Sequence, residues 1–537
     1  MTGADAIIKC LEAEGVTTVF GYPGVAICPF YNSILESDIR TILIRTEQNA
    51  AHAANGVSRM TGRPGVCAVT SGPGATNVIT GIATAFADSI PLICITGQVS
   101  SDLLGSDVFQ EADITGAVDS FVKYSYLVKK AEDIPRIFKE AFYIANTGRK
   151  GPVLIDIPID IQNAPVARFK YPEEISLRTY KPTVKGHAVQ IKKVIKELEK
   201  AKRPLICAGG GVILSDAQDE LKAFSEKHSV PVVSTMMGKG VMPTEHPLYY
   251  GMVGNNGEAY ANRAMNECDL LIMVGARVAD RAVNQPDLIT RDKVLVHIDV
   301  DPAEIGKNAG PTIPLVGDAK HIFDDLGKEE FNCSFIDWIK ALDWYRSTMP
   351  RKREPNPAYV DPAEFIMRLT DKMQDTAVYV ADVGQNQIWS CAYAKVRKGR
   401  FLTSGGMGTM GYSIPAAMGV KVAVPDRQVV AVCGDGSFQM SMMELATLCQ
   451  HDIPIKIVVL KNNYLGMVRQ FQHFAYDDKY SVVDLSGSPD LEKLAAAYGI
   501  PFLRLENMEK CDETIETFLK DDVTMLLECV IDPMDLV

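Results

Sequence analysis

The feature that most constrains the fold is the alternation of short β-branched runs with helical patterns along all 537 residues. Such runs stand at TILIRT (41–46), GVCAVT (65–70), PLICIT (91–96), PLICAGG (204–210), LLIMVGA (270–276), VLVHIDV (294–300), VVAVCG (429–434) and IKIVVLK (455–461). Alternating strands and helices are typical of parallel sheets with helices on both faces. We therefore predict an α/β fold of three doubly wound domains with mainly parallel sheets.

Two segments rich in charge and proline, near 165–190 and 345–362, interrupt this pattern and are interpreted as linkers. They predict domains at 1–165, 190–340 and 360–537. The first and last thirds share an order of strand, functional loop, helix and strand, which suggests a duplication.

Composition limits the partners and the compartment. With 67 acidic and 55 basic residues, the net charge of −12 disfavours nucleic acid and anionic membrane surfaces. The N-terminal segment carries Asp5, Lys9, Glu12 and Glu14, unlike a signal peptide, and no apolar stretch is long enough for a membrane span. The twelve cysteines occur singly, as buried reduced thiols would. We expect a cytoplasmic protein with small-molecule partners.

The strongest local motif is VVAVCGDGSFQM followed by IKIVVLKNNYLG, in which Asp435 and Asn462 each follow a predicted strand. Ligands bind at that edge of a parallel sheet. A carboxylate, an amide oxygen and the Tyr464 carbonyl suit Mg²⁺, while Gly434 and Gly436 allow phosphates to approach the backbone. On GDGS alone, an ordinary turn capped by Ser437 is an equal alternative.

Together, GDG, a helix, an apolar strand and Asn-Asn resemble the diphosphate-binding motif of thiamine-diphosphate enzymes. Such an enzyme needs a carboxylate at the cofactor's aminopyrimidine, and Glu47, after TILIRT, is our candidate. It also needs an apolar wedge that bends the two cofactor rings together, for which Met410 is the candidate. Taken singly, Glu47 could simply match a helix dipole and Met410 could fill the core.

The whole chain resembles the acetohydroxyacid synthase (acetolactate synthase) family, in particular its biosynthetic catalytic subunits. The matching stretches are VFGYPG (19–24), EQNAAHAANG (47–56), TSGPGATN (70–77), DSIPLICITGQV (88–99), GSDVFQEADITG (105–116), GPVLIDIPIDIQ (151–162), GARVADR (275–281), HIDVDPAEIGKN (297–308) and GMVRQFQ (466–472). ITGQV with GSDVFQEAD sets the chain apart from catabolic acetolactate synthases.

The resemblance implies that pyruvate is decarboxylated on thiamine diphosphate and condensed with a second 2-oxoacid. The product would be 2-acetolactate, or 2-aceto-2-hydroxybutyrate from 2-oxobutyrate, in the first common step of branched-chain amino-acid synthesis. The implied catalytic residues are Glu47, Phe109, Gln110 and Lys123. The implied cofactor-binding residues are Pro23, Gly24, Thr70, Gly72, Asn77, Gly384, Gln385, Asn386, Gly408, Met410, Gly434, Asp435, Gly436, Ser437, Asn462, Tyr464, Gly466 and Met467.

By its spacing, the middle third is a nucleotide-binding fold of unknown ligand. The resemblance implies FAD without a net redox role. The corresponding residues are Gly209, Gly210, Gly211, Arg277, Asp280, Arg281, Asp299 and Glu304. Without the resemblance, Arg277 would be interpreted as a salt-bridge partner.

The resemblance further implies a homodimer or homotetramer with active sites between subunits, and allows a small regulatory subunit. Departures from the family pattern concern the pocket: Val25 replaces a glycine, Asn386 a histidine, and Lys461 the first Asn of the NN pair. Phe471 replaces a Trp that favours 2-oxobutyrate, so pyruvate is the expected acceptor. Val25, Met467 and Phe471 are the candidate specificity residues.

Asn256 and Glu258 replace residues of the family's flavin region, where a carboxylate would disfavour an anionic cofactor unless it points away.

Three alternatives remain open. The nearest is another thiamine-diphosphate enzyme, such as a catabolic acetolactate synthase, a pyruvate oxidase or a different decarboxylase or carboligase. A nicotinamide-dependent dehydrogenase would need a G-x-G-x-x-G after a strand with an acidic residue about 20 positions on, and none of the eight predicted strands is followed by one. A non-catalytic relative would have no need of Glu47, Gln110 and Met410 together.

Overall fold

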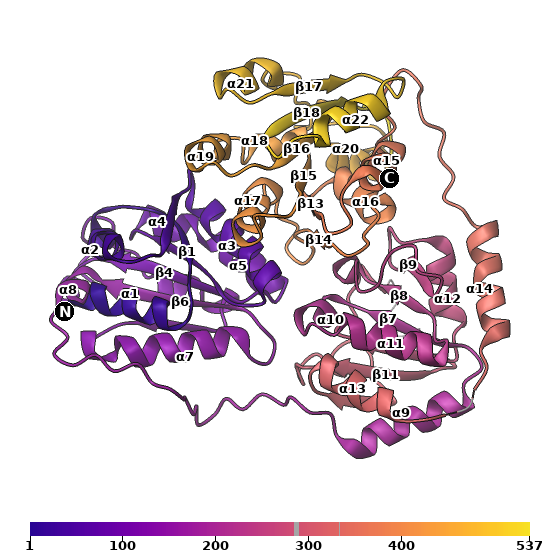
Figure 1. Ribbon diagram of the computed structural model, residues 1–537, viewed down its shortest axis with the longest axis horizontal. Coiled ribbons are helices and arrows are strands. Elements are labelled where there is room, and N and C mark those ends of the chain that lie inside the picture. Colours follow the sequence, from indigo (N-terminus) through magenta and orange to yellow (C-terminus); the bar gives the residue numbers. More distant parts are fainter. Residues whose placement is uncertain (284–288, 332) are drawn as a thin grey trace.

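The computed structural model describes residues 1–283, 289–331 and 333–537. It contains three six-stranded sheets whose neighbouring strands all pair in parallel (Figure 1). Each of the eight predicted runs forms a strand. The predicted fold class is confirmed.

The N-terminal sheet has the order β2-β1-β3-β4-β6-β5. Its strands are β1 (Thr18–Tyr22), β2 (Arg40–Leu43), β3 (Gly65–Val69), β4 (Leu92–Gln98), β5 (Tyr124–Leu127) and β6 (Pro152–Pro158). Its helices are α1 (Gly3–Ala13), α2 (Cys28–Ser33), α3 (Glu47–Thr61), α4 (Pro73–Asn77), α5 (Ile79–Ala87), α6 (Ile114–Ala117), α7 (Ile134–Asn146) and α8 (Ile159–Asn163).

The central sheet has the order β12-β11-β10-β7-β8-β9, which is the dinucleotide-binding order with its switch point between β7 and β10. Its strands are β7 (Pro204–Ala208), β8 (Val232–Ser234), β9 (Tyr249–Met252), β10 (Leu270–Val274), β11 (Val294–Asp299) and β12 (Ile313–Val316). Its helices are α9 (Ala188–Lys200), α10 (Gly210–Leu214), α11 (Gln218–His228), α12 (Ala259–Glu267), α13 (Ala319–Lys328) and α14 (Ile336–Thr348).

The C-terminal sheet has the order β14-β13-β15-β16-β18-β17. Its strands are β13 (Val378–Ala381), β14 (Arg400–Leu402), β15 (Val429–Gly434), β16 (Lys456–Lys461), β17 (Phe502–Leu505) and β18 (Met525–Val530). Its helices are α15 (Pro362–Lys372), α16 (Gln385–Tyr393), α17 (Ser413–Ala423), α18 (Asp435–Gln439), α19 (Glu444–His451), α20 (Gly466–Ala475), α21 (Leu491–Ala497) and α22 (Cys511–Leu519). Counted from its own first strand, this order equals that of the N-terminal sheet, as a duplication would produce.

The equivalent helices α3 and α17 pack directly on each other and join the two outer domains. A Cβ added at Gly56 would overlap the Ala416 carbonyl oxygen, and one added at Gly419 would overlap that of Ala53. The Ala-x-x-Gly segments of the two helices therefore interlock reciprocally. One apolar core runs through this contact and includes buried residues of both sheets.

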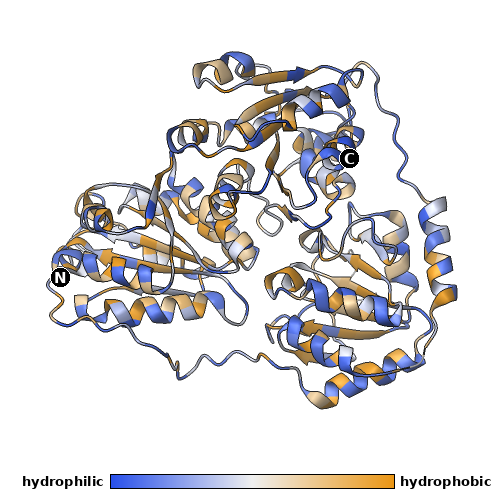
Figure 2. Cartoon of the chain, in the orientation of Figure 1, coloured by the Kyte–Doolittle hydropathy of each residue, from blue (hydrophilic) through white to orange (hydrophobic). Residues whose placement is uncertain are grey.

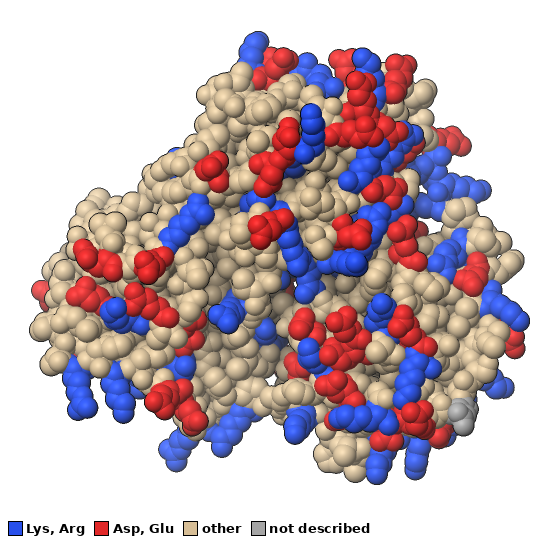
Figure 3. All heavy atoms as spheres, viewed as in Figure 1, with Lys and Arg blue, Asp and Glu red and all other residues tan. Residues whose placement is uncertain are grey.

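Hydropathy follows this layering, because the buried strands are apolar while the outer helices carry polar faces (Figure 2). On the face shown in Figure 3, acidic and basic side chains are interspersed. No helix among the described residues is long and apolar enough to cross a bilayer.

Candidate functional site

The predicted metal ligands meet at the carboxyl ends of β15 and β16. Asp435 opens α18, and its Oδ2 accepts a hydrogen bond of 2.7 Å from the backbone of Asn463. Asn462 Oδ1 accepts one of 2.9 Å from the Tyr464 backbone. Ser437 lies inside α18 and donates to the Gly434 carbonyl, so the capped-turn alternative does not describe this turn.

The chemistry of these donors fits Mg²⁺. Asp435 is 4% exposed, and burial raises the pKa of its carboxyl to about 6, although backbone hydrogen bonds and the charge of Lys461 act in the opposite direction. A buried carboxylate without a contacting cation is stabilised by a divalent ion. The described residues hold no group of three or more His, Cys, Asp or Glu side chains arranged for a metal, so only a mixed set with amide and carbonyl oxygens can serve here.

The neighbouring strand β13 brings Gln385 and Asn386 to the same edge. Asn462 Nδ2 lies 3.4 Å from Gln385 Oε1, and a Cβ at Gly466 would overlap that same oxygen. Asn386 Nδ2 donates to the Asp382 and Val432 carbonyls. A Cβ added at Gly434 would have only Asn386 Oδ1, at 3.7 Å, and the Leu460 carbonyl oxygen, at 4.0 Å, near it among the described residues. This turn therefore has space for a ligand.

The glycine-rich loop before α17 carries Met410 to this site. The Met410 methyl group lies 3.5 Å from the Cβ position of Gly436. Asp382, which the sequence reasoning missed, holds the loop, because its carboxylate accepts from the Gly411 and Ser413 backbone at 3.0 and 2.7 Å. The signal that could have revealed it is a lone charge at the end of the apolar run VYVAD.

A second cluster surrounds Glu47 at the carboxyl ends of β2 and β3. Asn77 Nδ2 donates to Glu47 Oε2 at 3.0 Å, and the Cβ position of Gly74 lies 3.4 Å from Oε1. Thr70 is buried beside Gly24, and its hydroxyl has no hydrogen-bond partner among the described residues. A carboxylate and an unpartnered hydroxyl beside glycines suit a small polar heterocycle.

The loop with Phe109 and Gln110 borders the Glu47 cluster. A Cβ at Gly72 would lie 2.9 Å from Gln110, whose backbone is left-handed at φ 60°. Phe109 is 86% exposed and Val25 is 76% exposed. On the other outer domain, Phe471 is 61% exposed and Met467 is half-buried. Such exposed apolar side chains are suited to contact a ligand or another chain.

Lys123 lies elsewhere in the N-terminal domain, where it closes the end of α7. Its Nζ donates to the Ile144 and Thr147 carbonyls and, at 2.7 Å, to the Tyr180 hydroxyl. Burial lowers its pKa to about 7. These contacts describe a structural lysine, and its catalytic role stays a prediction.

The two clusters are not bonded directly to each other in the described part of the chain. Among the described residues, no hydrogen bond or salt bridge joins Glu47 to Asp435, Asn462 or Tyr464. Each cluster therefore holds half of the predicted set.

The eight predicted flavin residues lie at the carboxyl ends of β7, β10 and β11. Gly209 and Gly211 pack against the backbone of Gly275, across the switch point. Arg277, Asp280 and Arg281 are exposed there. Burial raises the pKa of Asp299 to about 6, and Glu304 pairs with Arg149 of the N-terminal domain at 2.9 Å. The switch point thus offers cations and glycines to a nucleotide.

Glu258, the residue expected to disfavour an anionic cofactor, is half-buried and paired with Arg351 at 3.3 Å. The guanidinium of Arg351 also donates to the carbonyl of Asn256. The carboxylate is therefore countered by a cation of the linker.

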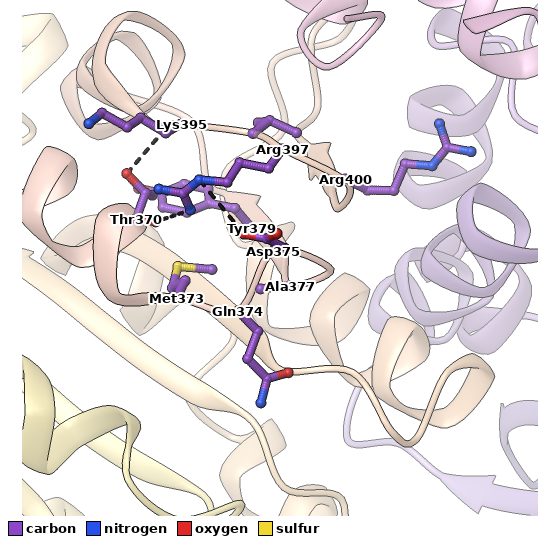
Figure 4. A pocket seen from close by; sticks show the side chains of 10 residues that line it. Thr370, Met373, Gln374, Asp375, Ala377, Tyr379, Lys395, Arg397 and Arg400 are labelled. Carbon is purple, nitrogen blue, oxygen red and sulfur yellow. Dashed lines mark hydrogen bonds and ion pairs between the residues drawn. The ribbon is translucent and has the colours of Figure 1, made fainter. Parts of the chain in front are cut away.

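A small separate pocket lies at the opposite, amino edge of the C-terminal sheet (Figure 4). Two of its cations are paired, because Lys395 and Arg397 contact Asp371 at 2.6 and 3.2 Å. The pocket is lined by Thr370, Met373, Gln374, Asp375, Ala377, Tyr379, Lys395, Val396, Arg397 and Arg400. It contains none of the predicted site residues.

Comparison with known proteins gives concordant matches over all three domains. The thiamine pyrophosphate enzyme family matches through its N-terminal TPP binding domain at 1–117, its central domain at 191–326 and its C-terminal TPP binding domain at 382–529. A probable acetolactate synthase large subunit of Methanocaldococcus jannaschii is 44% identical over 100% of this chain and 93% of its own. An acetolactate synthase of Arthrospira platensis is 41% identical over 98% and 94%. The acetolactate synthase large subunit of Corynebacterium glutamicum is 42% identical over 95% and 83%.

Proposed function

Because this chain belongs to the thiamine pyrophosphate enzymes and, among them, to the acetolactate synthase family, we propose that it makes 2-acetolactate from two molecules of pyruvate. This is the first common step of branched-chain amino-acid synthesis. The observation that carries the proposal is 41–44% identity to acetolactate synthases over at least 98% of the chain. The candidate oxygen ligands, which converge at the carboxyl ends of β15 and β16, agree with it. The second substrate is pyruvate, with 2-oxobutyrate as the alternative acceptor.

Each cluster has a distinct task in this reaction. Asp435, Asn462 and the Tyr464 carbonyl would hold Mg²⁺ and, through it, the cofactor's diphosphate. Glu47 would share a proton with a ring nitrogen of the aminopyrimidine, while Met410 would support the two rings. When bound, thiamine diphosphate would supply the thiazolium that takes up the electron pair left behind when carbon dioxide departs. Phe109 and Gln110 would shield that position from water.

The proposed assembly is a homodimer or homotetramer with each site between two chains; it is supported by the absence, among the described residues, of any hydrogen bond or salt bridge that joins Glu47 to Asp435. Some relatives are named large subunits, which supports a small regulatory partner. FAD in the central domain is proposed from the dinucleotide-type strand order and the exposed Arg277 and Arg281. Flavin absorbance of the purified protein tests it, and a colourless protein that also fails to take up added FAD would exclude it.

Product analysis tests the activity. The protein is incubated with pyruvate, thiamine diphosphate and Mg²⁺, with and without 2-oxobutyrate. Acetolactate as the main product supports the proposal. Acetaldehyde would indicate a simple decarboxylase, and acetyl phosphate with peroxide would indicate an oxidase; either result overturns it.

A further inference from the structure

Glu444 is a buried carboxylate to which the proposed chemistry gives no task. It is the first residue of α19 and is 0% exposed. The segment that carries it begins at Asp435, since only residues 440–443 separate α18 from α19. Glu444 nevertheless faces the N-terminal domain rather than the metal site.

Its contacts bracket Glu47 on both sides. Glu444 Oε1 accepts from the Arg45 backbone at 3.0 Å and from Asn49 Nδ2 at 2.9 Å. Its Oε2 accepts from the Thr447 hydroxyl at 2.6 Å. Burial raises the pKa of this carboxyl, while these donors lower it. Its contacts with Arg45 and Asn49 span the turn from which Glu47 projects.

That turn lacks a side-chain cap from its own helix. Thr46, at the cap position of α3, makes no side-chain hydrogen bond to the helix. The Arg45 guanidinium donates to the Leu43 carbonyl at 3.1 Å and to Gln450 at 2.6 Å. Glu444 therefore accepts a hydrogen bond from the Arg45 backbone and forms no ion pair with its side chain. The start of α3 is thus held in part by a side chain of another domain.

We propose that Glu444 is a positioning residue for Glu47, which aims the cofactor-activating carboxylate from the C-terminal domain of the same chain. The inference rests on the proposed function for the task of Glu47. In the proposed dimer, Glu47 and Asp435 of one chain serve different sites. Glu444 then connects the metal ligand of one site to the activating carboxylate of the other.

The test compares Glu444→Ala, Glu444→Gln and the matched control Gln450→Ala in the full chain. Gln450→Ala removes a bond from the same helix to the same residue, Arg45, but to its side chain. Two readouts are independent of turnover: amide hydrogen exchange of residues 44–49 without cofactor, and exchange of the cofactor's thiazolium C2 proton by NMR. Cofactor affinity in the presence of Mg²⁺ is measured alongside.

We expect Glu444→Ala to speed amide exchange at 44–49 and to slow C2-proton exchange, each about tenfold, with cofactor affinity nearly unchanged. Glu444→Gln should recover part of both, because its amide oxygen can accept the same two bonds. Gln450→Ala should match the unmodified protein. If Glu444→Ala does not fold, Glu444→Gln and Asn49→Ala make the same comparison.

Wild-type C2-proton exchange in Glu444→Ala would overturn the inference, as would equal effects of Glu444→Ala and Gln450→Ala. If the unmodified protein itself fails to accelerate C2-proton exchange, the proposed function is wrong. Faster amide exchange at 44–49 in Glu444→Ala would then leave Glu444 with a structural role only.

Discussion

The N-terminal and C-terminal domains share a strand order but carry different chemistry at equivalent places. After the edge strand β2 the chain presents Glu47 as the first residue of α3; after the equivalent strand β14 it presents Met410 and then α17. After β3 stands Thr70, whereas after the equivalent β15 stands Asp435. In the proposed function, one scaffold therefore supplies a proton-sharing half and a metal-binding half, and the loops rather than the sheet decide the task.

The largest expected effect comes from the proton-sharing half. Glu47→Gln should lower turnover about 10³-fold, because a neutral amide cannot exchange a proton with the aminopyrimidine. Cofactor affinity should change little, since the diphosphate is bound by the other half. Steady-state kinetics and cofactor titration measure both, with the exposed Glu36→Gln as control. Unchanged turnover would show that the role of Glu47 is misassigned.

The contact between the halves should be the next most sensitive. Gly419→Ala places a methyl group on the Ala53 carbonyl oxygen and should cost about 3 kcal/mol of unfolding free energy. Gly327→Ala, also within a helix and with no atom beyond that helix within 4 Å of its added Cβ, is the matched control and should be neutral to slightly stabilising. Denaturant unfolding compares the two. Equal stability of both variants would mean that the close α3–α17 packing is dispensable.

The metal-binding half is tested by Asp435→Asn. Losing the only carboxylate of the predicted set should weaken Mg²⁺-dependent cofactor binding roughly 100-fold. Asp426→Asn, before the opposite end of β15, should behave like the unmodified protein. Fluorescence titrations with Mg²⁺ at fixed cofactor give the affinities. Identical Mg²⁺ dependence in both variants would argue against Asp435 as a ligand.

The smallest effect concerns the acceptor. Phe471→Trp should raise the fraction of 2-aceto-2-hydroxybutyrate formed from mixed substrates about threefold, because the larger ring favours the longer acceptor. Phe474→Trp, on the same helix and also exposed, should not. The ratio of 2-aceto-2-hydroxybutyrate to 2-acetolactate, measured at equal concentrations of pyruvate and 2-oxobutyrate, compares the two variants. A shift in both variants would indicate a general effect of α20.

Much of this comparison is visible in the sequence, because strands and their terminal loops are encoded locally. The eight apolar runs predicted strands, and the polar residues after them predicted the edge at which Asp435 and Asn462 meet. Glu444 could not be predicted, since its partner Asn49 lies 395 residues away. Asp382 acts through the backbone of a distant loop, and Lys123 proved to be bonded to the end of α7, which no local pattern indicates.

The division of labour between two chains is tested most directly by mixing subunits. Glu47→Gln and Asp435→Asn are unfolded together in equal amounts, refolded, and assayed at a Mg²⁺ and cofactor concentration at which each variant alone is nearly inactive. If the halves meet across chains, each mixed dimer regains one intact site, and activity should reach about a quarter of that of the unmodified protein treated alike. No recovery in demonstrably mixed dimers would contradict this account and place both halves of each site in one chain.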